Sequence, residues 1–384
     1  MKCDGFAQYT PSVVYPGNPF IEALPAMLSS EELYSRTANY PSCEVTGKYN
    51  SLIQLQRLPL IEQTYQPTSF TQDLYIQIYC ALQTSYSLKE YLDVPRREGI
   101  ATSTSLVGVS GMGKSITVKK LLSLFPQIIM HTEYQGKPFA TVQLSYLMVE
   151  TPHNASVRSL CIEILKKVDE ATGSKFVAQY TKRGCTVDVL VAHITSIAKR
   201  VNLGLMVIDE IQNIVYGRND ELLNFVVQLS NSANISLCFV GTPKAIEPIT
   251  RHLRAARRAT GLILDRYDFG DDFNLVLDAL WRFQCTRKRA ALTPELREYL
   301  YTCCSGNTSV LVQLLMYAQE IAIRANDDCL EKRHFEAAKA KKMKLLLKTM
   351  EDTIGIEGTD ANVGSLGKKK LAQIGANAGR EAIA

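Results

Sequence analysis

Several signatures that would place a protein in a large class are missing from this sequence. Its 384 residues contain no apolar run long enough to span a bilayer, and residues 1–10 lack the apolar core of a secretory signal. The ten cysteines include no Cys-x-x-Cys pair, and no histidine lies at zinc-ligand spacing from one. We therefore expect a cytoplasmic protein with no membrane partner, no zinc cluster and no disulfides.

Motifs that read a DNA sequence are also missing, since there is no zinc finger and no clear helix-turn-helix pattern. The net charge is only +5, from 43 basic and 38 acidic residues. This small excess permits contact with nucleic acid but does not argue for it. Hydrophobic residues make up 46% and charged residues 21%, which is typical of a globular chain with two or three domains.

The residue pattern divides the chain into four parts. Residues 1–95 are a proline-rich arm with expected helices at 30–37 and 70–92. Residues 96–270 alternate short apolar runs with amphipathic segments, which predicts a parallel sheet covered by helices on both faces. Residues 271–348 contain only helical patterns, and residues 349–384 are a flexible basic tail.

The strands expected in the sheet are five apolar runs. These are residues 104–109, 139–144, 205–208, 236–240 and 262–267. The expected helices of the last two-thirds of the chain are 114–124, 156–170, 186–201, 219–233, 244–258, 272–287, 294–303, 307–325 and 331–348. The predicted fold class is α/β: a three-layer domain with five parallel strands, followed by a small helical lid and preceded by the arm.

A phosphate-binding loop follows the first expected strand. The sequence from Gly108 to Ser115 fits G-x-x-x-x-G-K-[ST] at every fixed position, between a strand and a helix. Backbone N–H groups of such a loop cradle phosphates, a lysine neutralises them, and a hydroxyl binds Mg²⁺. We expect the nucleotide to contact Gly108, Val109, Ser110, Gly111, Met112, Gly113, Lys114, Ser115 and Ile116. A dinucleotide fingerprint is excluded, because the third glycine is missing.

Two carboxylates end the apolar strand at 205–208. An ordinary acidic strand end would look the same, but the phosphate loop upstream favours a catalytic pair. Asp209 is then the acid on the metal side, sharing Mg²⁺ with Ser115. Glu210 is placed to orient the attacking water and accept its proton.

The next strand ends at Thr242, which we expect to contact the γ-phosphate or the water; it could equally cap the following helix. Arg257 and Arg258 close that helix and are candidates to complete a neighbouring subunit's site. A solvated basic helix end and a DNA-facing patch are the alternatives for this arginine pair.

Together these stretches resemble AAA+ ATPases of the initiator-like branch, and more narrowly the TnsC/TniB family, the regulators of Tn-seven-type transposons. The narrower resemblance is carried by the arm motif Asn-Pro-Phe-Ile-Glu-Ala-Leu-Pro at 18–25, by the phosphate loop and by Asp-Glu-Ile-Gln at 209–212. Val-Gly-Thr-Pro-Lys-Ala at 240–245 and Leu-Arg-Ala-Ala-Arg-Arg at 253–258 complete it.

The resemblance implies a bacterial ATPase that binds ATP and Mg²⁺ and assembles as a ring or helical filament on double-stranded DNA. It would link a TnsD/TniQ-type target selector, in some systems a CRISPR complex, to a TnsA/TnsB-type transposase, and hydrolysis would control disassembly. Contacts to DNA would be made to the backbone, by Lys137, His153 and Asn154.

The sequence departs from the family at two places. Residues 305–310 carry no arginine where many AAA+ proteins place a second sensor, which predicts slow hydrolysis that depends on assembly. The tail is shorter than in the longer family members, which weakens the case for a large transposase-binding region. A replication initiator or loader, a signalling ATPase and a nucleotide-gated scaffold with negligible turnover are the alternative functions.

Overall fold

The computed structural model describes residues 5–42, 50–95, 97–181, 185–214, 220–245 and 259–344. Residue contacts group the chain into two compact units. The first comprises Met1–Tyr40, Thr64–Ala279 and Ser305–Ser309, and the second comprises the rest. The boundaries expected at residues 95, 270 and 348 stay a prediction.

A five-stranded sheet forms the centre of the first unit. Its strand order is β4-β5-β6-β1-β7, and every neighbouring pair is parallel. The strands are β1 (Ser103–Gly108), β4 (Tyr146–Glu150), β5 (Leu205–Asp209), β6 (Ser236–Gly241) and β7 (Ala259–Leu264). This sheet confirms the predicted α/β class with five parallel strands.

The helices of the first unit lie before, between and after these strands. They are α1 (Pro19–Glu22), α2 (Ser30–Thr37), α4 (Ser69–Ser87), α5 (Lys114–Leu122), α6 (Val157–Thr172), α7 (Phe176–Tyr180), α8 (Val187–Arg200), α10 (Asp220–Ala233), the short 3-10 helix η2 (Pro243–Ala245) and α12 (Asp271–Trp281), whose last two residues belong to the second unit. The helix expected at 30–37 is confirmed as α2. The one expected at 272–287 ends early, at Trp281. Most of the one expected at 244–258 lies outside the described residues.

One predicted strand is wrong. Residues 139–144 do not join the parallel sheet, because they lie in β3 (Lys137–Leu144), which pairs antiparallel with β2 (Ile128–Tyr134). The two strands are joined at Gln135 and Gly136, whose φ angles of +50° and +76° make a tight two-residue hairpin turn. The sheet position expected for residues 139–144 is taken by β4, one of the two edge strands, which follows β3 after one residue; the apolar content of the sequence did not separate the two strands. The last strand, β7, also begins and ends three residues earlier than expected.

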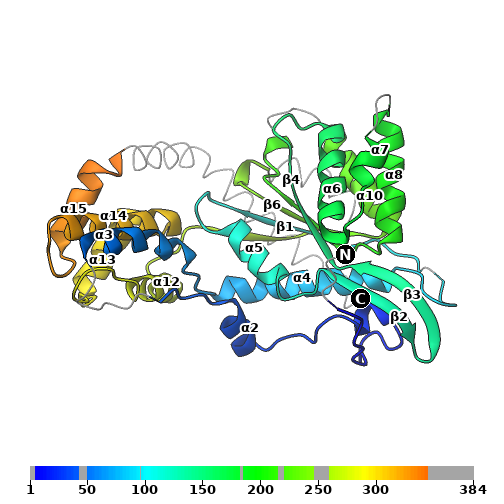
Figure 1. Ribbon diagram of the computed structural model, residues 1–384, viewed down its shortest axis with the longest axis horizontal. Helices are drawn as coiled ribbons and strands as arrows, with labels where there is room; N and C mark the ends of the chain where they lie inside the picture. Colours follow the sequence, from blue (N-terminus) through cyan, green and yellow to red (C-terminus); the bar gives the residue numbers. More distant parts are fainter. Residues whose placement is uncertain are drawn as a thin grey trace, which may run out of the picture. The chain divides into compact units, whose positions relative to one another are not determined.

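Alternate residues of the central strand β5 face opposite sides of the sheet. Met206 and Ile208 join a core that includes α6, α8 and α10, whereas Leu205 and Val207 join a second core that includes α4 and α5. All four side chains are fully buried. The helices therefore cover both faces in three layers (Figure 1), which explains why this strand lacks a polar–apolar alternation.

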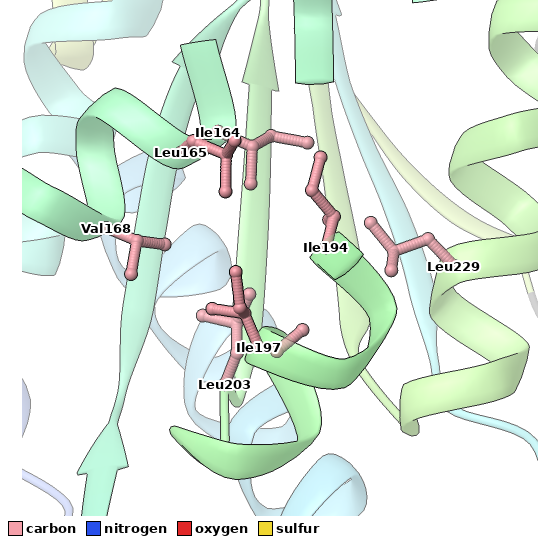
Figure 2. Close-up of a pocket in the computed structure, with 8 residues that line it drawn as sticks. Ile164, Leu165, Val168, Ile194, Ile197, Leu203 and Leu229 are labelled. Atoms are coloured by element: carbon pink, nitrogen blue, oxygen red, sulfur yellow. The ribbon is translucent and has the colours of Figure 1, made fainter. Parts of the chain in front are cut away.

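A small cavity lies in the core on the α6–α8–α10 side, with a volume of about 10 Å³. Figure 2 shows its lining, which is wholly aliphatic: Ile164, Leu165, Val168, Ile194, Ile197, Ala198, Leu203 and Leu229. A space of this size holds at most about one water molecule, and this lining offers it no polar partner. The cavity is therefore a packing gap rather than a ligand site.

Phe20, Ile21 and Leu24 of the N-terminal arm are part of the first unit's core. Asn18 caps α1 by accepting hydrogen bonds from the amides of Phe20 and Ile21 at 3.0 and 3.2 Å. Its amide group also donates to the carbonyl of Tyr86 at 3.0 Å. Phe20 is 1% exposed and packs its ring among those of Tyr86 and His131. The arm motif at 18–25 thus has a packing role.

The described part of the second unit consists of helices. They are α3 (Ser51–Arg57), the 3-10 helix η1 (Leu58–Gln63), α13 (Pro294–Cys304), α14 (Thr308–Arg324) and α15 (Lys332–Lys341). Trp281 donates its ring N–H to the carbonyl of Ala290 at 2.9 Å and stacks on Phe335. This confirms a helical C-terminal region, although the far end of the helix expected at 331–348 lies outside the described residues. No helix in the described ranges is long and apolar enough to cross a membrane.

Candidate nucleotide-binding site

The turn after β1 has the backbone that a phosphate loop needs. Gly111 and Gly113 have φ angles of +84° and +83°, a region that residues with a side chain rarely adopt. Gly113 is the N-cap of α5, so the helix begins at Lys114 and its first N–H groups face the turn. Gly108 touches β7 so closely that a Cβ there would lie 2.2 Å from the carbonyl oxygen of Leu264.

Lys114 is held within this loop. Its Nζ donates to the carbonyl oxygens of Gly108 and Val109, each at 2.8 Å. Burial lowers the pKa of Lys114, while the nearby carboxylates of Glu210 and Asp209 partly offset this by favouring the charged ammonium. The ammonium group of Lys114 is therefore held within the loop.

The register of the sheet brings the two acids to the same edge as this loop. Leu106 and Val107 of β1 pair with Val240 and Gly241 of β6, and Ile208 of β5 pairs with β6 from its other side. Parallel strands end at one edge of a sheet, so the ends of β1, β5 and β6 lie next to one another. Asp209 is the last residue of β5, Glu210 follows it, and Thr242 follows β6.

Asp209 and Glu210 differ in exposure. Asp209 is 5% exposed, and its carboxylate accepts a hydrogen bond from the amide of Glu210 at 2.9 Å. Thr151 fixes the Asp209 carbonyl with both its amide and its hydroxyl, each at 2.9 Å. Glu210 is exposed and has a φ of +53°, a strained conformation for a residue with a side chain. This turn directs the second carboxylate away from the strand axis.

Gln212 joins the ends of β5 and β6, a role that was not predicted from the sequence. Its side-chain amide donates to the carboxylate of Glu210, and its Oε1 accepts the backbone N–H of Thr242 at 3.1 Å. Gly241 leaves room for the contact, because a Cβ there would lie 2.7 Å from Gln212 Oε1. Only the spacing Asp-x-x-Gln after an apolar strand could have suggested it.

These features fit a triphosphate with Mg²⁺. Left-handed glycines next to a helix N-terminus form a concave array of N–H groups suited to an anion. Mg²⁺ is usually held by one or two protein oxygens together with phosphate oxygens. Ser115 at the start of α5 and the buried Asp209 are two such groups. Ile116 follows on α5 and is 52% exposed.

Of the other predicted residues, only His153 and Asn154 follow a strand that ends at this edge. Lys137 begins β3 at the hairpin turn, where its Nζ lies 2.8 Å from the carboxylate of Asp93, and both side chains are exposed. His153 and Asn154 follow β4, whose last residue Glu150 pairs with Asp209, so they leave the sheet at the same edge as the acids. The Asn154 carboxamide accepts the amide of Ser156 at 3.1 Å, in the turn that leads into α6. Arg257 and Arg258 lie outside the described residues.

The comparison with protein families agrees with this geometry. Residues 98–249 match the family described as AAA domain. Together with the five-stranded parallel sheet, this match shows that this part of the chain has the AAA+ P-loop fold. No curated protein matches the chain significantly.

Among solved structures, the chain is similar to the ORC1 protein of Aeropyrum pernix in complex with DNA, with 16% identity and a TM-score of 0.47. The match covers 71% of this chain and 64% of that one, less than two-thirds of its length. The chain is also similar to Drosophila ORC bound to DNA, with 13% identity, a TM-score of 0.47, and coverage of 84% and 72% of the two chains. At these identities and TM-scores neither similarity extends to function.

Proposed function

We propose that this chain is a Mg²⁺-dependent ATPase whose nucleotide state controls its assembly on duplex DNA, as in the TnsC/TniB-type regulators that it resembles. The nucleotide part rests on one observation. The phosphate loop that ends β1, with Lys114 held by its carbonyls, and the acids at the end of β5 lie at the same edge of the parallel sheet. A phosphate loop and two acids at one sheet edge are the parts needed to bind and hydrolyse a nucleoside triphosphate.

Each residue has a distinct part in the proposed reaction. The loop amides and Lys114 bind the phosphates, while Ser115 and Asp209 hold Mg²⁺, which supplies positive charge to the phosphate oxygens when bound. Glu210 orients the attacking water and accepts its proton. Thr242 contacts the γ-phosphate or that water from the end of β6. Arg257 or Arg258 completes the site of a neighbouring subunit, so turnover depends on assembly.

The transposition role rests on the sequence motifs. Two of them have structural counterparts: the arm motif packs Asn18 and Phe20 against Tyr86, and the Gln of Asp-Glu-Ile-Gln bridges Glu210 and Thr242. In this proposal the bacterial, cytoplasmic protein links a TnsD/TniQ-type selector to a TnsA/TnsB-type transposase. Double-stranded DNA is bound through its backbone by the surfaces that carry Lys137, His153 and Asn154.

Nucleotide binding is tested with Lys114→Ala, using Lys119→Ala on the exposed face of α5 as the matched control. A fluorescent ATP analogue should bind the wild type and the control alike and should fail to bind the Lys114 variant. Equal binding by both variants would overturn the phosphate-loop assignment.

The assembly step needs its own experiment. Electron microscopy of the protein with duplex DNA should show rings or filaments with a non-hydrolysable ATP analogue and dispersed protein without nucleotide. Affinity for DNA should also fall steeply with salt, because the contacts are to phosphates. Assembly that ignores nucleotide would favour a static scaffold over a switch.

A further inference from the structure

The phosphate loop is held from outside by a second segment of the first unit, Ser305–Ser309. The side-chain amide of Asn307 donates to the carbonyl oxygen of Ser110 at 2.9 Å. The backbone N–H of Ser309 donates to the carbonyl oxygen of Gly111 at 3.0 Å. Two consecutive carbonyls of the loop are therefore bonded by one short segment almost 200 residues away, and Asn307 is only 4% exposed.

The segment and the loop approach so closely that side chains are excluded between them. A Cβ on Gly111 would lie 2.8 Å from Asn307 Oδ1 and 2.9 Å from the Cβ of Ser309. Two independent constraints thus require a glycine at position 111: its left-handed φ and the close contact with residues 307 and 309.

The segment is also fixed on its other side. Gly306 has a φ of +72°, and a Cβ there would lie 2.0 Å from the carbonyl oxygen of Tyr267. The amide of Tyr267 donates to the carbonyl of Gly306 at 3.2 Å. Ser305, with a φ of +48°, completes a left-handed pair that turns the chain toward the loop. The contacts with Tyr267 therefore fix the backbone that positions the side-chain amide of Asn307.

The two hydrogen bonds have a consequence for the loop's amides. In a trans peptide the C=O and the N–H point in opposite directions. Bonding the carbonyls of Ser110 and Gly111 from one side fixes the N–H groups of Gly111 and Met112 toward the other side. Those N–H groups belong to the array that the proposed function assigns to phosphate.

We propose that Asn307 is a positioning residue for the triphosphate. Assisted by the Ser309 amide, it holds two peptide planes of the loop with their N–H groups ready for phosphate. In this proposal Asn307 acts through the loop and does not touch the nucleotide. A second-sensor arginine of the kind absent from residues 305–310 would instead contact phosphate directly. The proposal rests on the proposed nucleotide site and deepens it.

The carboxamide has the chemistry for this role. It supplies a neutral N–H donor to a carbonyl, whereas an aspartate of the same shape would offer only acceptors. Asn307→Asp would set a carboxylate against the Ser110 carbonyl and add negative charge beside the phosphates. Asn224→Ala removes the same side chain at an exposed position of α10 and is the matched control.

The test measures the dissociation constant of a fluorescent ATP analogue in EDTA, so that neither Mg²⁺ nor turnover enters the result. Loss of one hydrogen bond that preorganises a binding site corresponds to about a fivefold weakening, expected for Asn307→Ala. Asn307→Asp should weaken binding further, and Asn224→Ala should match the wild type. The thermal midpoint without nucleotide, and its rise on adding ATP, are recorded for each variant.

The outcomes separate this inference from the function on which it rests. If the wild type binds no nucleotide even when Mg²⁺ is added, the proposed function fails; if it binds only with Mg²⁺, the variants are compared with Mg²⁺ and a non-hydrolysable analogue. If the wild type binds, Lys114→Ala does not, and both Asn307 variants bind like the wild type, only the positioning role is overturned. A lower midpoint without nucleotide but unchanged affinity would make Asn307 a merely structural residue and would also overturn it. Should Asn307→Ala not fold, the nucleotide affinity of the isosteric Asn307→Asp variant decides whether Asn307 has a positioning role.

Discussion

Gln212 donates its side-chain amide to the carboxylate of Glu210. Because the same side chain accepts the amide of Thr242 at 3.1 Å, one carboxamide spans the ends of two neighbouring strands. Glu210 sits in a left-handed backbone conformation and is exposed, so little else restrains its side chain. We infer that the proposed base is oriented by Gln212 and that this orientation is tied to the end of β6.

Gln212→Ala should therefore lower turnover without weakening nucleotide binding. A general base contributes about a hundredfold or more, and loss of its orientation should cost about tenfold in kcat. The affinity for ATP should stay within about twofold of the wild-type value, because the loop that binds phosphate is untouched. The measurements are steady-state ATPase assays and analogue binding. Gln228→Ala, on an exposed part of α10, is the control, and an unchanged kcat for Gln212→Ala would refute the orienting role.

Glu210→Gln tests the base itself. The amide keeps the shape of the side chain but accepts a proton far less readily, so ATP should bind and persist. We expect kcat to fall by about a hundredfold or more, with longer assemblies on DNA in the presence of ATP. Rapid quench and electron microscopy measure the two effects. Glu90→Gln, at an exposed position, should behave as the wild type; turnover by Glu210→Gln at the wild-type rate would place the base elsewhere.

The sequence predicted the sheet well because its central strands are buried on both faces. Runs such as Leu205–Asp209 combine β propensity with unbroken apolarity, and parallel topology follows from the helices between them. The phosphate loop was predictable for another reason, since glycines with positive φ and a lysine at fixed spacing are dictated by local geometry.

Other features depend on contacts between distant residues and leave no local signal. The hairpin turn at Gln135 and Gly136 lacks the usual Asn-Gly pair, so β3 was mistaken for a strand of the sheet. Asn307 and the phosphate loop are far apart in the chain and meet only in the folded unit. Nothing in the residues around Asn307 distinguishes it from an ordinary residue at the start of a helix.

A pH dependence of stability is expected from His131. The ring is 2% exposed; its Nδ1 lies 2.7 Å from the hydroxyl of Tyr9 and its Nε2 2.8 Å from Oε1 of Gln143. The Gln143 amide group donates to the carbonyl of Phe20 at 3.0 Å, which directs Oε1 at the ring. A neutral imidazole with a proton on Nε2 satisfies both contacts. Burial lowers the pKa of His131, and the bond with Gln143 offsets this in part.

The lowered pKa of His131 determines in which direction stability changes with pH. Below the ordinary histidine pKa of about 6.5 the unfolded chain binds a proton that the folded chain does not. The contribution of neutral His131 to the stability of the fold is therefore complete above about pH 6.5. It is lost as the pH falls from there toward the lower pKa that His131 has in the folded protein. Thermal midpoints between pH 8 and pH 5 should fall on the acidic side. His131→Leu should flatten this fall, while His153→Leu, at an exposed position, should not; equal slopes for the two variants would contradict the assignment.

The arm motif gives the last prediction. Asn18 is 4% exposed, accepts the amides of Phe20 and Ile21, and donates to the carbonyl of Tyr86. Asn18→Ala removes a helix cap and leaves a buried carbonyl without that donor, which should lower the free energy of unfolding by about 2–3 kcal/mol. Asn50→Ala is the matched control, because Asn50 caps α3 through the amide of Ile53 at an exposed position.

The control variant should lose only about 1 kcal/mol, the ordinary value of a solvent-exposed cap. Urea unfolding of the two variants measures the difference between them. If Asn18→Ala costs no more than Asn50→Ala, the buried contact with Tyr86 adds nothing to capping, and the arm is held to the AAA+ domain by the packing of Phe20 instead. If it costs more, the first residue of the arm motif fastens the arm by its polar side chain as well, and substituting it should release the arm before the sheet unfolds.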